Sequence, residues 1–398
     1  MDSVTLAIDG GSPTRQTMLP YGRQAIDESD IAAVVKALRN DLLTTGPLVT
    51  EFEHTFAKSI GAAEAVAVSS GTAALHAAMF AIGISPGDEV IVPAMTFAAT
   101  ANSVVYCGGK PIFADVNPNT LLIDPIDVER KITPRTRAII GVDYAGQPCD
   151  YVALRTLANQ HGLQLVADAC HAMGGKDSNQ SVGTLADLNV FSLHPVKHIT
   201  SGEGGLVSTD DIALAARMRL FRNHGITTDH QQRTKNGQWF YEMTELGFNY
   251  RITDFQCALG MSQLQKLEQW VNKRQYIAKL YDIAFASVEE VSPLLVRQGV
   301  FHAYHLYVIQ LSTENLKVGR DQIFAAMRAE GIGVNVHYVP VHLHPYYKMH
   351  FNTRLGVCPV SEASYERILT LPMFPEMSRD DVFSVVSALT KIIGYYQK

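Results

Sequence analysis

Residues Val68–Leu75 (Val-Ser-Ser-Gly-Thr-Ala-Ala-Leu) have the pattern of a strand end, a turn of small residues and the start of a helix. Ser70, Gly71 and Thr72 stand at this turn, where free N–H groups and the helix dipole favour a phosphate group. Small residues also occur at such turns simply because they pack closely. This block alone therefore leaves both interpretations open.

A second block, Leu165–Gly174, carries Asp168 directly after a short apolar run. Ligands of open α/β sheets bind at the C-terminal ends of strands, and a buried carboxylate there needs a partner such as a cationic heterocycle. The alternative is that Asp168 only caps a following helix.

A third block, Val190–Gly205, places Lys197 in a loop of histidine, proline and small residues, with no acidic side chain before Glu203. A desolvated lysine has a lowered pKa and becomes a nucleophile, whereas a lone loop lysine is usually solvated surface. Pyridoxal 5′-phosphate (PLP) chemistry requires a phosphate-binding site, an acid that pairs with the pyridinium and a lysine that forms a Schiff base. The three blocks supply candidates for these groups in this order.

The elements that position these blocks alternate between short apolar strands and helices, which predicts a mostly parallel sheet covered on both faces. A helix over Ser29–Leu38 is expected, with Ser29 as its cap and Ile31, Val34, Val35 and Leu38 on one apolar face. Strands are predicted at Ala65–Val68, Glu89–Pro93, Pro111–Asp115, Ala138–Val142, Leu163–Ala167, Asn189–Ser192 and Gly205–Ser208, with helices at Thr72–Ile82 and Tyr151–Gln160.

The pattern changes after Thr253, where apolar residues at helical spacing predict one long helix, or two in line, to about Phe285. We expect a large domain over residues 1–260 and a smaller C-terminal α+β domain over residues 261–398. The smaller domain is predicted to contain a strand at Tyr304–Leu311, a helix at Arg320–Glu330 and a strand at Val334–Tyr338.

Composition argues against several classes of protein. The 398 residues include 33 Lys and Arg against 39 Asp and Glu, a net charge of −6, which does not suit nucleic-acid binding. The five cysteines form no Cys-x-x-Cys pair, so neither a disulfide framework nor a metal site is indicated. No signal peptide and no run of ~20 apolar residues is present, so we expect a cytoplasmic protein without membrane association.

The blocks together resemble the DegT/StrS-type family of PLP-dependent sugar-nucleotide aminotransferases over nearly the whole chain. The resemblance implies the aspartate-aminotransferase-like fold type I of PLP-dependent transferases. Within the family, the sequence is most similar to the branch of UDP-4-amino-4,6-dideoxy-N-acetyl-β-L-altrosamine transaminases of pseudaminic acid synthesis. The motifs that carry the family resemblance are Thr44-Thr-Gly-Pro, Ser70-Gly-Thr-Ala-Ala-Leu, Pro93-Ala-Met-Thr-Phe-Ala-Ala-Thr, Asp168-Ala-Cys-His-Ala, Lys197 with Glu203-Gly-Gly, and Gly247-Phe-Asn-Tyr-Arg.

The resemblance implies roles for particular residues. Lys197 would hold the cofactor covalently and move a proton, Asp168 would keep the pyridine nitrogen protonated, and Phe97 would stack on the ring. His171 stands where much of the family has Gln and would bind the phenolic oxygen. The phosphate would be bound by Ser70, Gly71, Thr72 and Ser192, and by Asn249 of a neighbouring subunit, which implies a homodimer with shared active sites.

Other residues are less determined. Arg251 could bind a substrate carboxylate or phosphate or form a surface ion pair, and Tyr338 could contact the nucleotide sugar or pack in the core. Ala167 replaces the Glu that many family members carry before this Asp, which puts the substrate subgroup in question but not the chemistry. The sequence assigns no role to His194, His198, Arg222, His224 or His337.

The function implied is transfer of an amino group from L-glutamate to the 4-keto carbon of a nucleotide-linked deoxy-hexose, for which UDP-4-keto-6-deoxy-HexNAc is the first candidate. Pyridoxamine 5′-phosphate (PMP) would be the intermediate form of the cofactor. Two alternatives remain at this stage: a PLP-dependent sugar dehydratase or lyase on the same scaffold, and a non-catalytic binding homologue.

Overall fold

The computed structural model describes residues 5–228, 237 and 239–398. Its centre is a seven-stranded sheet in the order β1-β9-β8-β5-β4-β2-β3, and all seven predicted strands are present in it. Strands β2, β3, β4, β5 and β8 are parallel neighbours, while β9 runs antiparallel to both β1 and β8. The strands are β1 (Glu64–Val68), β2 (Glu89–Pro93), β3 (Lys110–Ala114), β4 (Thr136–Val142), β5 (Gln164–Asp168), β8 (Leu188–Ser192) and β9 (Gly205–Thr209).

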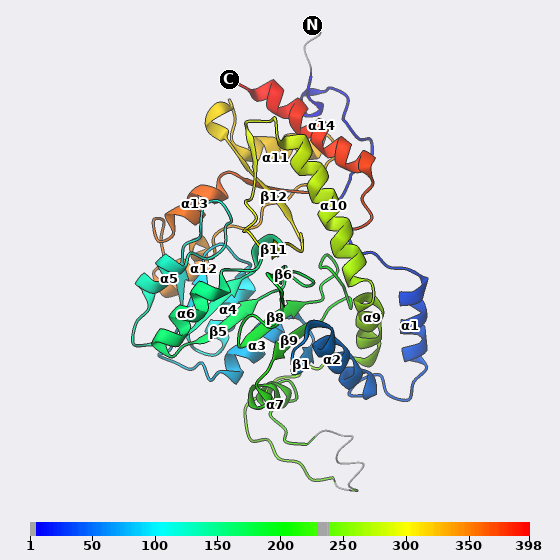
Figure 1. Cartoon of the computed structure of the whole chain (residues 1–398), viewed down its shortest axis with the longest axis vertical. Coiled ribbons are helices and arrows are strands. Elements are labelled where there is room, and N and C mark those ends of the chain that lie inside the picture. The colour runs from blue at the N-terminus through cyan, green and yellow to red at the C-terminus, as the bar shows by residue number, and fades with distance from the viewer. Residues whose placement is uncertain (1–4, 229–236, 238) are drawn as a thin grey trace.

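Helices cover the sheet on both faces, as the alternating pattern predicts (Figure 1). The helices of this half are α1 (Glu28–Leu38), α2 (Pro47–Ile60), α3 (Gly71–Ala81), α4 (Ala98–Tyr106), α5 (Pro125–Lys131), α6 (Tyr151–His161), α7 (Ile212–Phe221) and α9 (Asp254–Leu264). Helix α3 is apolar around its whole circumference because it packs between the sheet and helices α4 and α7. None of the helices in the described part of the chain has the length and apolar content needed to cross a membrane.

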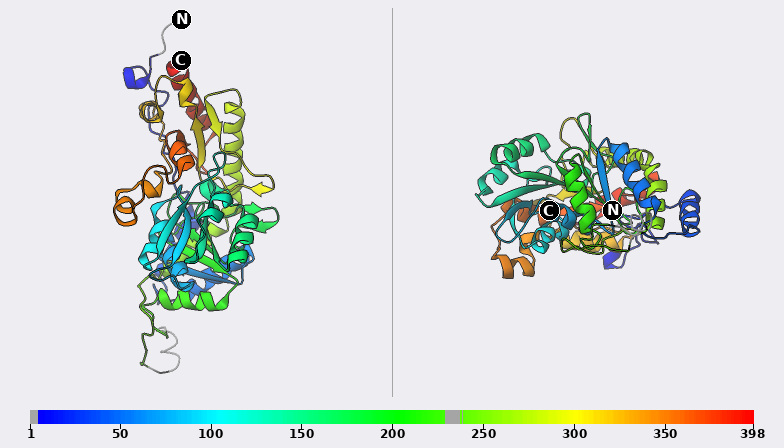
Figure 2. Two further views of the ribbon diagram at one scale, coloured as in Figure 1. Left: turned by 90° about the vertical axis from the view of Figure 1, so that its left-hand side faces the viewer. Right: turned by 90° about the horizontal axis from the view of Figure 1, so that it is seen from below.

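The C-terminal part follows α9 through α10 (Leu267–Phe285), which continues nearly in line toward the top of the molecule in Figure 1. The prediction of two helices in line is therefore confirmed. A three-stranded antiparallel sheet in the order β10-β12-β13 packs there against α10, α11 and α14 (Figures 1 and 2). The segment around Ser12 lies beside α14, where Lys391 donates to the Ser12 carbonyl. The remaining elements are α11 (Arg320–Ala329), α12 (Pro345–Phe351), α13 (Pro359–Tyr365), α14 (Arg379–Tyr396), β10 (Val291–Pro293), β12 (Tyr307–Leu311), β13 (Ile368–Leu371) and a small sheet of β6 (Lys176–Asp177), β7 (Gln180–Ser181) and β11 (Val300–Phe301).

Two predicted strands of this part differ from the structure. Strand β12 begins at Tyr307, because residues 303–306 instead pair with the turn at residues 144–146, through Ala303 N–H to Gly146 O and Leu306 N–H to Ala145 O. The segment Val334–Tyr338 forms a single bridge at Asn335, whose side chain accepts from the N–H of Val336 and so diverts the backbone from a ladder.

The prediction for α1 was wrong in one respect and incomplete in another. Asp27, not Ser29, caps the helix by accepting from the N–H groups of Ser29 and Asp30. Helix α1 packs on α9 through Asp30 and Ala37, while the predicted apolar face faces solvent in the single chain. Its exposed members are Ile31, Val35 and Leu38, whereas Val34 is half-buried.

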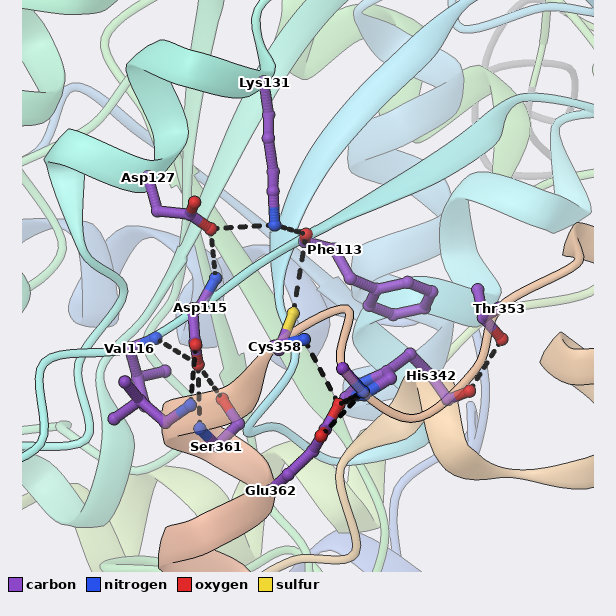
Figure 3. Close-up of polar contacts among 12 residues, drawn as sticks. Phe113, Asp115, Val116, Asp127, Lys131, His342, Thr353, Cys358, Ser361 and Glu362 are labelled. Carbon is purple, nitrogen blue, oxygen red and sulfur yellow. Dashed lines mark hydrogen bonds and ion pairs between the residues drawn. The ribbon is translucent and has the colours of Figure 1, made fainter.

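A polar cluster ties the segment that follows Tyr338 to the central sheet (Figure 3). The Asp115 carboxylate, buried after β3, accepts from the N–H groups of Val360 and Ser361 at 2.8 Å and from the Ser361 hydroxyl at 2.7 Å. It thereby caps helix α13. The buried His342 lies 2.8 Å from the Glu362 carboxylate, which also accepts from the N–H of Cys358. These contacts fix the position of the chain on both sides of α12.

We predict that Asp115→Ala lowers the free energy of unfolding by about 2–4 kcal/mol, because it leaves buried N–H groups of α13 without an acceptor. Asp124→Ala is the matched control: its carboxylate caps α5 through one exposed bond to the N–H of Ile126, and its loss costs about 1 kcal/mol. Urea unfolding of the two variants measures both values. Equal losses would contradict the structural role given to Asp115.

Candidate functional site

A cavity of about 530 Å³ lies at the C-terminal ends of β1, β2, β5 and β8, where the polar residues of the three sequence blocks meet. Two segments of the C-terminal part, at His305 and at residues 335–338, close its other side. Nine residues predicted for the site from sequence line this cavity: Ser70, Gly71, Thr72, Phe97, Asp168, His171, Ser192, Lys197 and Tyr338.

The turn after β1 forms one wall. Ser70 caps α3 by accepting from the N–H of Ala73, which leaves the N–H groups of Gly71 and Thr72 at the start of the helix. A Cβ on Gly71 would lie 2.9 Å from the Ser192 Cβ, so this position requires glycine for close approach of the two loops. The helix N-terminus and the Ser192 hydroxyl together provide donors for a phosphate group.

The carboxylate of Asp168 is buried at the end of β5. Its Oδ2 accepts from the Thr100 hydroxyl at 2.7 Å, and Thr100 in turn lies 2.7 Å from Thr96. Oδ1 accepts a long bond, 3.3 Å, from the N–H of Cys170. Asp168 therefore presents an incompletely used carboxylate oxygen beside the cavity, which suits an N–H⁺ donor on a ring.

Lys197 lies in the turn after β8, with its Nζ 3.4 Å from Nε2 of His305. Loss of solvent around the ammonium lowers the pKa of Lys197, although the negative charge of Asp168 opposes the shift. A larger share of Lys197 is therefore the free amine, which can add to an aldehyde.

Aromatic groups face the same space. Phe97 is 59% exposed in this single chain, with its ring 5.9 Å from that of Tyr338. The Tyr338 hydroxyl lies 3.0 Å from Nε2 of His171, while Nδ1 of His171 is buried without a hydrogen-bond partner in the described part of the chain. Burial holds the pKa of His171 well below its ordinary value, so this imidazole is neutral at pH 7.

Taken together, these groups match a flat, cationic, phosphorylated ring with an aldehyde. The donors of Gly71 and Thr72 suit a phosphate, the Asp168 carboxylate suits a ring N–H⁺, and the exposed face of Phe97 suits stacking. The amine of Lys197 suits the aldehyde. The residues present therefore fit PLP.

Two predicted residues lie outside this cavity. Asn249 is exposed at the base of the segment that follows α7, where Asn223 and Asn249 form a bridge. Arg251 lines a separate cavity of about 530 Å³, and its guanidinium donates to Asn223 Oδ1 at 2.9 Å. In the described structure neither side chain contributes to the cavity of its own chain.

The unassigned residues separate into two groups. His194 and His337 line the Lys197 cavity, and Nδ1 of His337 lies 2.9 Å from the Thr370 hydroxyl. His198 is buried behind the cavity and donates from Nε2 to the carbonyl of Ala303. Arg222 forms a buried ion pair with Glu53, and His224 lies at the base of the segment that carries Asn249.

The sequence assigned no role in the site to Thr100, although Thr100 ends the motif that begins at Pro93, and none to His305. Thr100 lies in the first turn of α4, while Thr96 precedes the N-cap Phe97, so the contact between their hydroxyls depends on the backbone turn before the helix. His305 gave no local signal: it lies 108 residues from Lys197 in the chain and was placed in a predicted strand.

The chain is similar to known proteins over nearly its whole length. Residues 24–390 match the family described as the DegT/DnrJ/EryC1/StrS aminotransferase family. The spore coat polysaccharide biosynthesis protein SpsC of Bacillus subtilis is 39% identical over 95% of this chain and 98% of that protein.

Solved structures are similar as well. Helicobacter pylori PseC, an aminotransferase involved in the biosynthesis of pseudoaminic acid, superimposes with a TM-score of 0.89 at 30% identity, over 96% of this chain and 100% of the other. A putative sugar aminotransferase of Streptococcus pneumoniae, Spr1654, has a PMP form that superimposes with a TM-score of 0.89 at 28% identity, over 95% of this chain and 100% of the other, and it is also known in a PLP form.

A second buried carboxylate lies next to Asp168 and predicts a pH effect on stability. Asp143 accepts from the Tyr151 hydroxyl at 2.7 Å and from the N–H of Cys149, but its Oδ2 has no partner among the described residues. Burial raises the pKa of Asp143 from 3.8 to about 7, although the bond from Tyr151 opposes the shift and the charge of Asp168 adds to it.

Because the folded state holds this proton more tightly than the unfolded chain, the stabilisation from Asp143 is full below pH 4 and is lost as the pH rises toward 7. Asp143→Asn cannot titrate, so the melting temperature of the wild type should fall relative to that of Asp143→Asn between pH 4 and 8. Thermal unfolding across this range, with the exposed Asp41→Asn as control, tests the effect. A constant difference would contradict it.

Proposed function

Because this chain belongs to the DegT/DnrJ/EryC1/StrS aminotransferase family, whose structural neighbours are PLP-dependent sugar aminotransferases, we propose that it transfers the amino group of L-glutamate to the 4-keto carbon of a nucleotide-linked 6-deoxy-hexose. Glutamate is converted to 2-oxoglutarate in the first half-reaction, and the keto sugar is converted to a 4-amino sugar in the second. The amino group lost by glutamate is the one gained by the sugar, so atoms and electrons balance. UDP-4-keto-6-deoxy-HexNAc is the proposed acceptor, supported by the similarity to the pseudaminic acid branch.

One observation carries this proposal: the Lys197 amine and the Asp168 carboxylate share a cavity with a phosphate seat and an exposed aromatic ring. PLP, when bound, withdraws electrons from the carbon that loses a proton. In the proposed site, Lys197 would hold the cofactor and carry the proton on Nζ, and Asp168 would bind the ring nitrogen. Thr100 orients Asp168 through its hydroxyl.

The remaining residues bind and orient. The phosphate would contact the turn at Ser70–Thr72 and the Ser192 hydroxyl, while Phe97 would cover the ring and exclude water. His171 would bind the phenolic oxygen through its free Nδ1, since its Nε2 is used by Tyr338. Because the Tyr338 hydroxyl is hydrogen-bonded to His171, a contact of Tyr338 with the nucleotide sugar would also involve His171. His194 and His337, which also line the cavity, are available to the sugar.

We also propose that the active unit is a homodimer. The apolar face of α1 is exposed, and the described residues beyond α7 include Trp239, 84% exposed, and Leu246, 75% exposed, on a segment that projects away from the molecule (Figures 1 and 2). Apolar surfaces of this kind mark contacts with another protein. A second copy of the chain is the proposed partner, because the site lacks the contribution of Asn249 in a single chain.

The base of this projecting segment is fixed rather than loosely attached. The backbone of Tyr250 accepts from the N–H of Ser69, and the rings of Phe248 and Tyr250 stack with centroids 5.1 Å apart. The Tyr250 hydroxyl also lies 3.1 Å from Nδ1 of His76. Asn249 is therefore held in a defined position on the outside of its own chain, from which it would reach the phosphate of the partner. Arg251, two residues on, is proposed to bind an anionic group of the substrate there.

The first test is an absorption spectrum before and after addition of L-glutamate. The band of lysine-bound PLP should give way to that of PMP with release of 2-oxoglutarate, and a 4-keto-hexose carrying UDP should restore the first band. Lys197→Ala should abolish turnover, and borohydride should no longer attach the cofactor covalently to the protein. The exposed Lys176→Ala should leave both properties unchanged.

Each contrary result has a definite meaning. A PLP band that ignores glutamate contradicts glutamate as the donor, and turnover of the sugar without 2-oxoglutarate favours the dehydratase or lyase reaction. Restoration of the band by a keto-hexose on thymidine diphosphate but not on UDP contradicts the proposed nucleotide. Full activity of Lys197→Ala contradicts the role of Lys197.

The second test uses complementation between subunits. Asn249→Asp should prevent cofactor binding in the partner by placing a carboxylate against the phosphate, and Lys197→Ala inactivates its own site. When equal amounts of the two inactive variants are unfolded and refolded together, random pairing should restore about one quarter of wild-type sites, because half of the dimers contain one intact site. No recovery would contradict sharing of the active site between subunits.

A further inference from the structure

Four buried imidazoles lie around Lys197, those of His171, His198, His305 and His337, and the sequence assigned a role to only one of them, His171. His305 is 5% exposed and His198 is 2% exposed. His171 uses Nε2 for the Tyr338 hydroxyl, and His198 uses Nε2 for the carbonyl of Ala303. In the part of the chain that the structure describes, His305 Nε2 is the side-chain group within hydrogen-bond reach of Lys197 Nζ, at 3.4 Å.

The chain holds His305 firmly in this place. The buried guanidinium of Arg274 donates from Nη1 to the carbonyls of Tyr304 and His305, each at 3.2 Å, and to that of Met373 at 3.1 Å. The N–H of the next residue, Leu306, donates to Ala145 at 3.1 Å. One guanidinium thus binds the carbonyl of His305 and those of Tyr304 and Met373. The backbone of His305 is therefore fixed, which limits the positions of its imidazole.

The groups that face His305 decide its protonation. They are the cations Lys197 and Arg274 and the imidazoles His171 and His198, with the ring of His171 at a centroid distance of 4.4 Å. Burial, and then the charge of Lys197, keep the pKa of His305 well below its ordinary value. A neutral imidazole carries one nitrogen that accepts a hydrogen bond, whereas a lysine ammonium has only donors. Opposite the ammonium form of Lys197, Nε2 of His305 can therefore only accept, which places the proton of the neutral ring on Nδ1, a buried atom without a partner among the described residues.

We propose that His305 is a positioning residue for Lys197, an inference that rests on the proposed function. His305 accepts a hydrogen bond from Nζ of Lys197 whenever this nitrogen is not bound to the cofactor. An amine that donates one N–H to His305 has its remaining valences, including its lone pair, directed away from His305. This contact therefore holds the free amine of Lys197 in one orientation within the cavity. Without His305, the amine rotates freely and is in this orientation only part of the time.

The proposal predicts the direction of a pKa change. An acceptor favours the charged form of the donor, so its removal should lower the pKa of Lys197. His305→Leu removes the acceptor at similar volume, while His305→Gln keeps an oxygen acceptor close to the position of Nε2. The buried His76 lies outside the cavity, so His76→Leu is the control for loss of a buried imidazole in the labelling without cofactor, where the Asn249 segment that His76 supports through Tyr250 has no part.

The experiment measures labelling of Lys197 by acetic anhydride in the full-length chain without cofactor, quantified by mass spectrometry from pH 5 to pH 11. In His305→Leu the midpoint should move down by about 1 pH unit, and in His305→Gln and His76→Leu by much less. With PLP bound, His305→Leu should lower kcat about 10–100-fold with little change in the KM for glutamate, and His305→Gln should recover most of it.

The outcomes separate the alternatives. An upward shift in His305→Leu means that His305 donates to the amine instead of accepting from it, which overturns the proposal. Equal behaviour of the Leu and Gln variants means that the imidazole only fills space, and this overturns the proposal too. Because the labelling uses neither glutamate nor a sugar, a wild-type protein that ignores glutamate would defeat the proposed function while the role of His305 is still measured.

Discussion

The buried carboxylate of Asp168 is the group on which the arrangement of the site depends. A charge at the end of a central strand is costly unless donors surround it, and here the Thr100 hydroxyl and the N–H of Cys170 supply only part of what it needs. The protein therefore holds an acidic group ready for a cationic partner. Lys197 lines the same cavity and is also desolvated, but it follows a different strand, β8. A ring can therefore lie between the side chains of Asp168 and Lys197.

Both halves of the fold are needed to build this environment. The parallel strands deliver Asp168, Lys197 and the turn at Gly71 to one edge of the sheet because parallel strands end on the same side. The C-terminal half then covers this edge with residues 303–306, which pair with the turn at residues 144–146, and with the segment that ends at Tyr338. Burial by this cover lowers the pKa values of Lys197 and the nearby histidines.

A single chain still presents surfaces that are costly to leave in water. The outer face of α1 and the projecting segment around Trp239 are apolar, and Asn249 is fixed at the base of that segment and faces away from its own cavity. Pairing two chains would bury the apolar surfaces and deliver Asn249 to a second site at the same time. The stability of the assembly and the completeness of the site are thus linked in the proposed dimer.

The sequence by itself determined the strands of the central sheet and the order of the three chemical blocks, because apolar periodicity, glycine turns and short motifs are local properties of the chain. It also placed nine residues that meet in one cavity, from Ser70 to Tyr338. Only the tertiary structure decided that Tyr304–His305 leave the predicted strand, that Val334–Tyr338 turn toward the cavity, and that the apolar face of α1 points outward. The contact between Lys197 and His305 joins segments 108 residues apart, and no local pattern encodes such a distance.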